Sequence, residues 1–310
     1  MLDMVSFYSI SSITFQKTLP LKRPILLYFV NFSISIRTGA LKLKKLEHLS
    51  DIYNSYETFI IDLWGVMHNG IKLNIKALEA VDKLIENKKK IVFLSNAPRP
   101  SIEVKNFLRK LEMKEKYLDN VLTSGEATMI ALKQNKFGKY FYHLGPGKDN
   151  SIFYHIKENK RNLENCDFIL CTGLLDTQET NLSYYENLFK KNLSKKFICA
   201  NPDLTVHKGN REEYCAGKIA QIFESLGGNV IYFGKPHKEI YHMCFQENEK
   251  VLAIGDNLNT DIKGANNMKI DSIFISSGVH RNEFKSKEEL NLLTLKYKVR
   301  VNFFQEQLKW

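Results

Sequence analysis

Two rhythms of hydrophobic and polar positions alternate along the chain from Glu57 onward. Short, mostly apolar runs predict strands buried on both faces, as in parallel sheets. Longer segments with apolar residues every three to four positions predict amphipathic helices, for example over 75–86, 102–111 and 216–226. The predicted strands are 59–62, 91–95, 140–144, 168–171, 197–200, 230–233, 251–255 and 272–275. This alternation predicts an α/β fold whose largely parallel sheet is covered by helices.

The number of predicted strands bears on domain organisation. Eight strands with their crossover helices are many for a single sheet. We therefore expect two α/β units rather than one. The sequence shows no internal repeat and no Pro/Gly-rich linker. A second domain would therefore be inserted through short hinges. In such sheets functional side chains gather just beyond the carboxyl ends of the strands, so the residues that follow each strand are the first candidates for a site.

Composition and charge restrict the classes of binding partner that we expect. The 310 residues are 44% hydrophobic and 25% charged, which is typical of one large or two modest globular domains. The net charge of +11 is compatible with nucleic acid, but no basic run alternates with aromatic residues, so we expect no nucleic-acid partner. The five cysteines form no CxxC pair and no zinc-type spacing with histidine. They favour reduced thiols in a cytoplasmic protein.

The first 40 residues differ from the rest of the chain. They contain one acidic residue, Asp3, and are rich in Ser, Ile and Phe. Their apolar run, 25–36, is short for a membrane span, so membrane attachment is not expected. We interpret residues 1–40 as a basic N-terminal extension that is disordered or dispensable. The alternative is a targeting or anchoring segment.

Chemically complementary groups stand at four of the predicted strand ends. A phosphate ester dianion repels nucleophiles, so its transfer requires a metal, a cation and an aligned nucleophile. Each group alone is common in turns or at helix ends. Their occurrence together favours a phosphoryl-transfer site. In chain order the groups are Asp62, Ser95 with Asn96, Lys235, and Asp256 with Asp261.

Each of these side chains has an expected role. Asp62 would be the nucleophile that forms an aspartyl-phosphate, and its other oxygen would bind Mg²⁺. Asp256 would complete the oxygen shell of Mg²⁺ with water and a backbone carbonyl. Lys235 would hold the transferring oxygens. Ser95 and the backbone amide of Asn96 would donate hydrogen bonds to the phosphoryl group. We thus expect a Mg²⁺ cofactor and a small phosphorylated substrate.

Asp261 is the second carboxylate of the last strand end. We expect it to support the site, although it could instead begin a helix over 261–267 and interact with the dipole of that helix. Arg99 and Lys208 could contact a distal anion of the substrate, but solvated surface positions are the simpler interpretation. A homo-oligomer is possible, and the sequence does not decide the oligomeric state.

The four strand-end segments resemble the motifs of the haloacid dehalogenase-like superfamily. They are Asp62-Leu-Trp-Gly-Val, Leu94-Ser-Asn, Gly234-Lys-Pro and residues 255–262. Further segments resemble subfamily IIA, which includes nucleotide-monophosphate and p-nitrophenyl phosphate phosphatases. These are Gly70 and residues 123–127, 201–203 and 215–217. The resemblance covers residues 57–280.

The resemblance also implies a domain arrangement. The core would be Rossmann-like with a parallel sheet, formed by residues 41–135 and 231–310. A C2-type α/β cap would be inserted between the second and third motifs, over residues 136–230. Such a cap excludes water from the site and selects the substrate.

One position departs from the family pattern. Family phosphatases usually carry, two residues after the nucleophile, an aspartate that acts as general acid and base. Here Trp64 stands in its place, as in a branch of the subfamily that this chain resembles. An indole has no proton to exchange at a useful pKa, whereas the backbone carbonyl of Trp64 could still bind the metal.

Three interpretations of Trp64 stay open. The substrate could have a good leaving group, such as an acyl phosphate. His68 could substitute as the acid, since the unperturbed pKa of histidine is about 6.5. Alternatively, the protein could bind metal and a phosphorylated ligand without efficient turnover. We expect a Mg²⁺-dependent phosphohydrolase, with the non-catalytic binding protein as the alternative.

Overall fold

The computed structural model describes residues 43–208 and 211–310. The predictions made for residues 1–40 lie outside this part of the chain. Within the described part, none of the helices is both long and apolar enough to cross a membrane.

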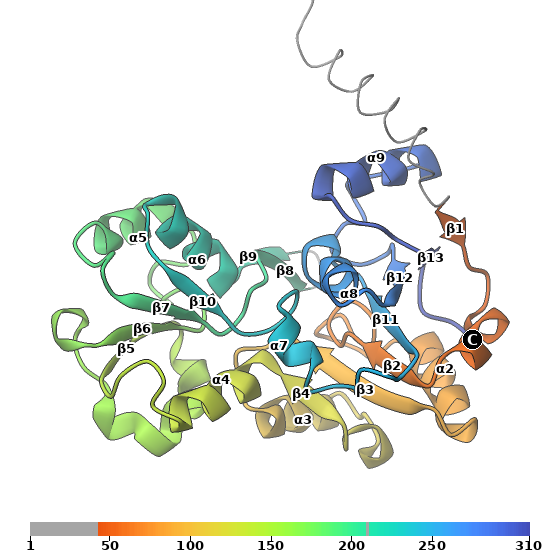
Figure 1. Cartoon of the computed structure of the whole chain (residues 1–310), viewed down its shortest axis with the longest axis horizontal. Coiled ribbons are helices and arrows are strands. Elements are labelled where there is room, and N and C mark those ends of the chain that lie inside the picture. Colours follow the sequence, from red (N-terminus) through yellow and green to blue (C-terminus); the bar gives the residue numbers. More distant parts are fainter. Residues whose placement is uncertain (1–42, 209–210) are drawn as a thin grey trace, which may run out of the picture. The chain divides into compact units, whose positions relative to one another are not determined.

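The larger of two extended sheets is built entirely of parallel neighbours. Its order is β1-β13-β12-β11-β2-β3-β4, so β2 lies between β11 and β3 (Figure 1). The strands are β1 (Lys44–Lys45), β2 (Thr58–Ile61), β3 (Lys90–Ser95), β4 (Val121–Thr123), β11 (Val251–Gly255), β12 (Asp271–Ile275) and β13 (Phe303–Gln305).

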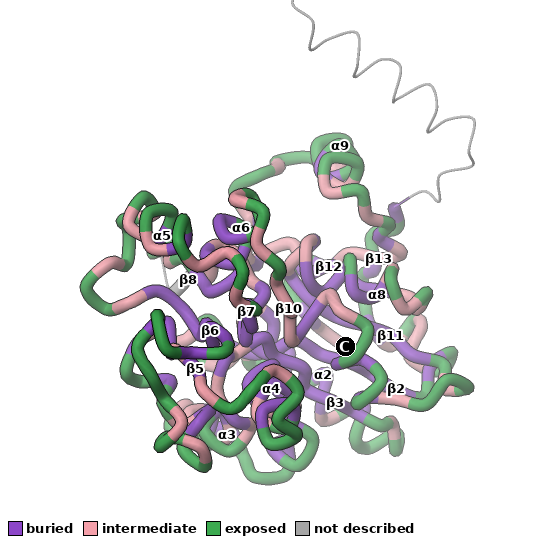
Figure 2. The backbone as a smooth tube through the Cα atoms, turned by 60° about the vertical axis from the view of Figure 1, so that its left-hand side comes forward, coloured by how far each residue is buried: buried purple, intermediate pink, exposed green. Residues whose placement is uncertain are grey.

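Both faces of the larger sheet are covered. On one face Phe59, Ile61 and Phe93 pack in the same cluster as residues of α2 and α3, while Ile60 and Leu94 join residues of α4 and α7 on the other. This two-sided burial explains why the strands read as nearly continuous apolar runs, and Figure 2 shows β2, β3 and β11 as buried. The helices of this unit are α2 (Ile75–Glu86), α3 (Ser101–Lys110), α4 (Ser124–Lys133), α7 (Lys238–Tyr241), α8 (Lys263–Met268) and α9 (Lys287–Tyr297).

A second α/β unit, called the cap below, is inserted between α4 and α7. Its parallel sheet has the order β10-β7-β6-β5, and a two-stranded antiparallel hairpin joins it. Helices α5 (Leu182–Phe189) and α6 (Ala216–Ser225) pack on one face through aromatic residues such as Phe189 and Phe223. The strands are β5 (Phe141–Leu144), β6 (Phe168–Cys171), β7 (Lys196–Cys199), β8 (Thr205–Lys208), β9 (Arg211–Tyr214) and β10 (Val230–Tyr232).

The predicted fold class is confirmed: the protein has a Rossmann-like core with a parallel sheet and an inserted α/β cap. Every predicted strand is present with each end within one residue of its predicted position. Strands β1, β4, β13 and the hairpin β8–β9 were not predicted, because they are short and carry polar residues. The helix considered over 261–267 is present but begins three residues earlier, since a π-helix spans Leu258–Ile262 and continues directly into α8 from Lys263.

Candidate active site

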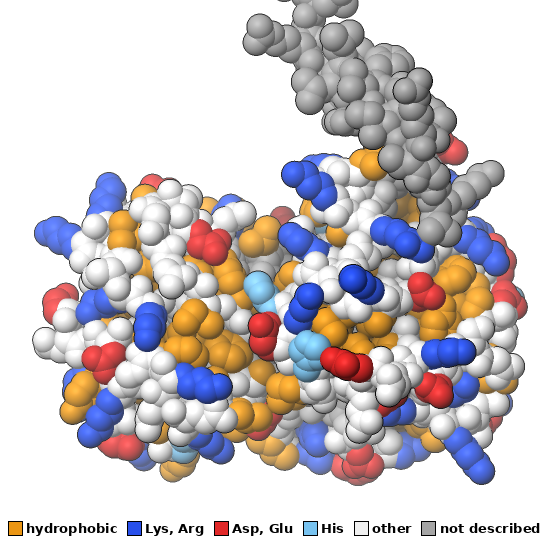
Figure 3. Space-filling model, viewed as in Figure 1, with side chains coloured by type: hydrophobic (Ala, Val, Ile, Leu, Met, Phe, Trp, Pro, Cys, Tyr) orange, Lys and Arg blue, Asp and Glu red, His pale blue; other side chains and the backbone are white. Residues whose placement is uncertain are grey.

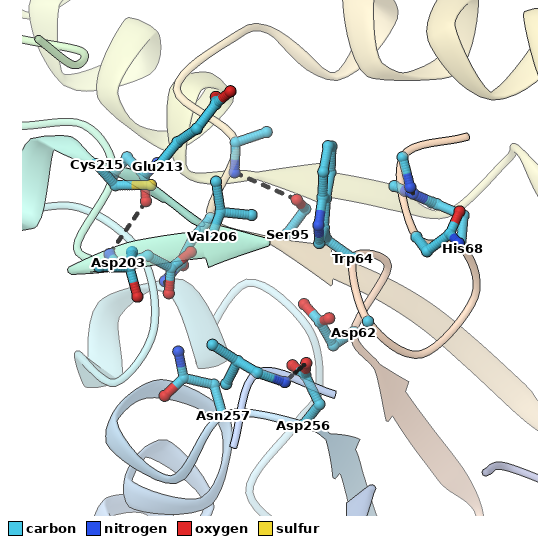
Figure 4. A pocket seen from close by; sticks show the side chains of 18 of the residues that line it. Asp62, Trp64, His68, Ser95, Asp203, Val206, Glu213, Cys215, Asp256 and Asn257 are labelled. Atoms are coloured by element: carbon cyan, nitrogen blue, oxygen red, sulfur yellow. Dashed lines mark hydrogen bonds between the residues drawn. The ribbon is translucent and has the colours of Figure 1, made fainter. Parts of the chain in front are cut away.

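Three of the predicted residues meet at one edge of the larger sheet. Asp62 follows β2, Ser95 ends β3 and Asp256 follows β11, and these three parallel strands are direct neighbours. Figure 4 shows the three side chains around one pocket. Lys235 reaches the same place from the loop after β10. All four line a cavity of about 1150 Å³ whose walls come from both the core and the cap.

Lys235 places an ammonium group beside the predicted carboxylates. Its Nζ donates to Asp62 Oδ1 at 2.5 Å, to Asp261 Oδ1 at 2.7 Å and to the Leu94 carbonyl at 2.9 Å. Burial opposes the charged form of this side chain, which is only 3% exposed, but the two carboxylates outweigh that effect and raise its pKa. Lys235 is therefore an ammonium ion held in a fixed position. Asp261 thus faces the site through Oδ1, and it also lies in the first turn of the π-helix, where its Oδ2 accepts from the amide of Asn257 at 3.1 Å.

The carboxylates around Lys235 have the features of a cation site. One oxygen from each of Asp62, Asp256 and Asp261 lies within 4.8 Å of the others. Burial raises the pKa of Asp62 despite the nearby Lys235, and burial followed by the charge of Asp261 raises the pKa of Asp256 to about 8. Asp62 Oδ2 is buried and has no hydrogen-bond partner. A divalent cation with oxygen ligands would relieve this repulsion, so the donor set fits Mg²⁺.

Backbone segments that lie close to Asp256 fix the orientation of its side chain. The amide of Val279 donates to Asp256 Oδ2 at 2.7 Å. A Cβ atom at Gly65 or at Gly278 would lie 2.1 Å from the same oxygen, so neither position has room for a side chain. Gly65 also has a φ of +94°, which favours glycine. The sequence predicts Asp256 as a site residue, but it does not predict these contacts, which come from two distant loops.

The side chain of Asn96 holds the lysine loop. Its Oδ1 accepts from the Lys235 amide at 2.8 Å, and its Nδ2 donates to the Lys235 carbonyl and to Asp203 Oδ1, each at 3.1 Å. Burial raises the pKa of Asp203, which comes from the cap, to about 6. The Ser95 hydroxyl accepts from the amide of Ala97 at 3.2 Å (Figure 4). Asn96 therefore links the loop after β3, the lysine loop and the cap.

A histidine that the sequence analysis did not single out supports the loop after β11. His280 Nε2 accepts from the amide of Leu258 at 3.1 Å, and its Nδ1 lies 2.5 Å from Glu283 Oε1. The residue is 4% exposed. A lone histidine outside every motif gives no signal in the sequence, so only the folded arrangement reveals this contact.

Trp64 and His68 form an aromatic group beside Asp62. The Trp64 indole is nearly parallel to the ring of Phe107, at 6.4 Å between centroids, and meets the His68 ring edge-on at 5.1 Å. A Cβ atom at Gly70 would lie 2.6 Å from the indole, and the φ of Gly70 is +83°. The His68 ring is buried, its Nδ1 accepts from the Gly70 amide, and burial lowers its pKa to about 4. His68 is thus neutral near pH 7 and supports the indole.

Comparison with known proteins identifies the family. A haloacid dehalogenase-like hydrolase model matches residues 59–156, and a HAD-hydrolase-like model matches residues 232–293. The acid sugar phosphatase of Staphylococcus epidermidis is 27% identical over 244 residues, which cover 75% of this chain and 92% of that protein. The structure of a haloacid dehalogenase-like hydrolase from Brucella suis matches with a TM-score of 0.74 and 28% identity, covering 85% of this chain and 99% of that one.

A further match is the 4-nitrophenylphosphatase of Thermotoga maritima, with a TM-score of 0.62, 24% identity and coverage of 83% of this chain and 96% of that one. The chain belongs to the haloacid dehalogenase-like hydrolases. Within them its resemblance to subfamily IIA is confirmed by a structural match to a putative NagD protein, with a TM-score of 0.58 and 25% identity over 75% of this chain and 93% of that one. The first matched segment contains Asp62 and Ser95, and the second contains Lys235 and Asp256.

Proposed function

We propose that the protein is a Mg²⁺-dependent phosphohydrolase of small phosphorylated metabolites that works through an aspartyl-phosphate at Asp62. The observation that carries this proposal is the buried, unpartnered Oδ2 of Asp62, which lies beside two further carboxylates and the ammonium of Lys235. Relatives named acid sugar phosphatase support the reaction class. Asp62 Oδ2 is open to phosphorus or to the metal, while Oδ1 accepts from Lys235.

The roles follow from these positions. Attack by Asp62 forms a bond to phosphorus while the bond to the leaving group breaks, and water then hydrolyses the acyl phosphate. Lys235, Ser95 and the backbone amide of Asn96 stabilise the transferring oxygens. Asp261 keeps Lys235 in position. Mg²⁺, held by Asp62, Asp256 and the backbone carbonyl of Trp64, would neutralise charge on the phosphoryl group.

The cap would enclose the substrate. We assign residues 41–135 and 231–310 to the core and 136–230 to the cap. Figure 4 shows Val206 and Glu213 of the hairpin β8–β9 at the same pocket as Asp62 and Ser95. Closure of such a wall over a bound phosphate would exclude water and strengthen the electrostatic contacts.

The setting we propose is cytoplasmic, with no nucleic-acid partner. The five cysteines are free and buried, which agrees with a reducing compartment. Figure 3 shows Lys and Arg side chains interspersed with Asp and Glu on the visible face rather than gathered in a stripe. Both observations suit an enzyme of small metabolites.

Phosphate release from a broad panel of phosphorylated metabolites tests this function. With Mg²⁺ we expect turnover of at least one ester or acyl phosphate, and chelation by EDTA is expected to reduce it by about 10²-fold or more, since the metal stabilises the transition state by several kcal/mol. Addition of Mg²⁺ after EDTA should restore the rate. A raised unfolding temperature with Mg²⁺ and a phosphorylated ligand, without phosphate release from any compound, would instead indicate a binding protein.

Stabilisation of the protein by Mg²⁺ should grow with pH. Because burial raises the pKa of Asp256 to about 8, the folded metal-free protein holds this proton more tightly than the unfolded chain does. That contribution to stability is complete below the unfolded pKa of about 3.9 and is lost as pH rises through about 8. Mg²⁺ binds the ionised carboxylate and competes with the proton.

Thermal unfolding with and without Mg²⁺ checks this expectation. The rise in unfolding temperature on adding Mg²⁺ should be larger at pH 8 than at pH 5.5. The variant Asp256→Asn, which cannot ionise, should show little rise at either pH. An equal rise at the two pH values in the wild type would contradict the prediction.

A further inference from the structure

Arg99 lies in the loop between β3 and α3, three residues after Asn96, and lines the same cavity. A chain extends at most about 3.6 Å per residue, so the Cα atoms of Asn96 and Arg99 are no more than roughly 11 Å apart. That span suits a small metabolite whose phosphate lies at Asn96 and whose other end reaches Arg99. The position of Arg99 therefore makes it a candidate for contact with the distal end of the substrate.

The backbone of Arg99 is fixed from the β4–α4 junction. Thr123 Oγ1 donates to the Arg99 carbonyl at 2.7 Å. Gly125 lies so close that a Cβ atom there would be 2.3 Å from the Arg99 amide nitrogen and 2.4 Å from its carbonyl oxygen. Gly125 belongs to the 123–127 segment noted in the sequence. Through these contacts the 123–127 segment holds the loop that contains Arg99.

The guanidinium of Arg99 pairs with a carboxylate of the cap. Its Nε lies 3.4 Å from Asp149 Oδ1, and the Asp149 side chain is only 3% exposed. Both atoms are buried and neither has a hydrogen-bond partner, so the pair is held by charge. By contrast, 33% of the Arg99 side chain stays exposed. Arg99 thus keeps accessible surface while it is paired with Asp149, and it lines the cavity.

A second cationic side chain stands beside Arg99 on this wall of the cavity. Lys148, the neighbour of Asp149, is exposed and also lines the cavity. Asp176 lines it as well, but accepts from the amide of Gly147 at 3.3 Å. A guanidinium whose side chain is already held loses little entropy on binding, and its planar fork matches carboxylate and phosphate oxygens.

We propose that Arg99, held by Asp149, is a distal anion subsite, and that the preferred substrates carry a second anionic group, either a carboxylate or another phosphoryl group. The premise that the substrate carries a phosphate which is cleaved at Asp62 comes from the proposed function above. Lys148 adds a second, more exposed cation to the same wall. The side chain of Lys208, the other residue considered for this role, lies outside the described part of the chain.

Two matched substrate pairs test the subsite with Mg²⁺ present. 3-Phosphoglycerate is compared with glycerol 3-phosphate, and fructose 1,6-bisphosphate with fructose 6-phosphate. In at least one pair the wild type should prefer the compound with the second anion by about 10-fold or more in kcat/KM, as expected for a charge-assisted bidentate contact. The pair that shows the preference identifies the anion as carboxylate or phosphate. Absence of a preference in both pairs would overturn the proposal.

Variants assign the preference to Arg99. Arg99→Gln should reduce the ratio about 10-fold, mainly through KM of the substrate with the second anion, and Arg99→Lys should keep part of it. Arg109→Gln is the matched control, because Arg109 also pairs with a carboxylate, Glu115, but on the exposed side of α3 and outside the cavity. It should leave the ratio unchanged. A ratio unchanged in both Arg99 variants would overturn the subsite.

Binding separates this subsite from the proposed function. Titration calorimetry with the same four compounds on Asp62→Asn measures affinity without turnover. An Arg99-dependent difference in Kd, found while the wild type releases no phosphate, would retain the subsite and reject the phosphohydrolase. Phosphate release with no dependence on Arg99 in either kcat/KM or Kd would reject the subsite and retain the phosphohydrolase.

Discussion

Replacing Trp64 with aspartate is expected to raise kcat for alkyl phosphate esters by about 10² to 10⁴-fold, the usual contribution of a positioned general acid. An alkoxide leaving group needs a proton, which neither the Trp64 indole nor the buried, neutral His68 can supply near pH 7. A carboxyl at position 64 would stand two residues after the nucleophile. An acyl phosphate, whose leaving group needs no proton, should gain far less. Steady-state kinetics on one substrate of each kind measures the difference.

The matched control is Trp64→Asn, which has the same size as the aspartate variant but no transferable proton. Both variants lose the ring contacts with Phe107 and His68, so both should be destabilised, by about 3 kcal/mol. Only the aspartate variant should gain activity on alkyl esters. Equal gains would show that space in the pocket, rather than the acid, limits the rate. No gain in either variant would contradict the claim that a missing general acid limits the rate.

Replacing Asp62 with asparagine is expected to lower kcat by about 10⁴-fold or more, as removal of a nucleophile does elsewhere. The amide keeps the size of the side chain but cannot attack phosphorus, and it leaves Lys235 paired with Asp261 alone. The loss should therefore appear in turnover, with the fold retained. Phosphate release and the unfolding temperature, measured on the same preparation, separate the two effects.

The control for that substitution is Asp82→Asn. Asp82 also accepts from a lysine, Lys116, but it lies on α2, more exposed and away from the cavity. Its loss removes the same charge and an ion pair of similar length, and it should leave kcat unchanged. A comparable loss in both variants would mean that net charge, not the identity of Asp62, controls the rate.

Much of the fold could be predicted because its strands are buried on both faces. Strand β2 and strand β3 are nearly uninterrupted apolar runs, and such runs at regular spacing indicate a parallel sheet. The short edge strands gave no such signal. Strand β1 is two exposed lysines, and β9 reads Arg-Glu-Glu-Tyr, so in both cases pairing with a neighbour decides the structure rather than hydrophobicity.

For the site, the sequence predicts the residues at strand ends but not those that hold them. Asp62, Ser95 and Asp256 could be grouped because neighbouring parallel strands end at the same edge. The contact of His280 with Leu258 and the pairing of Arg99 with Asp149 join segments that no periodicity relates. Such contacts depend on how loops approach one another after the sheets have formed. The catalytic assignments themselves remain predictions.

Detection of the covalent intermediate tests the central claim most directly. The wild type is mixed with Mg²⁺ and a turned-over substrate, quenched in acid within one turnover and digested, and the peptide containing Asp62 is examined by mass spectrometry. The account predicts an added phosphoryl group on Asp62, discharged by hydroxylamine and absent from Asp62→Asn. Substrate turnover with no phosphoryl group on Asp62 at any quench time, or with the group on another residue, would contradict it.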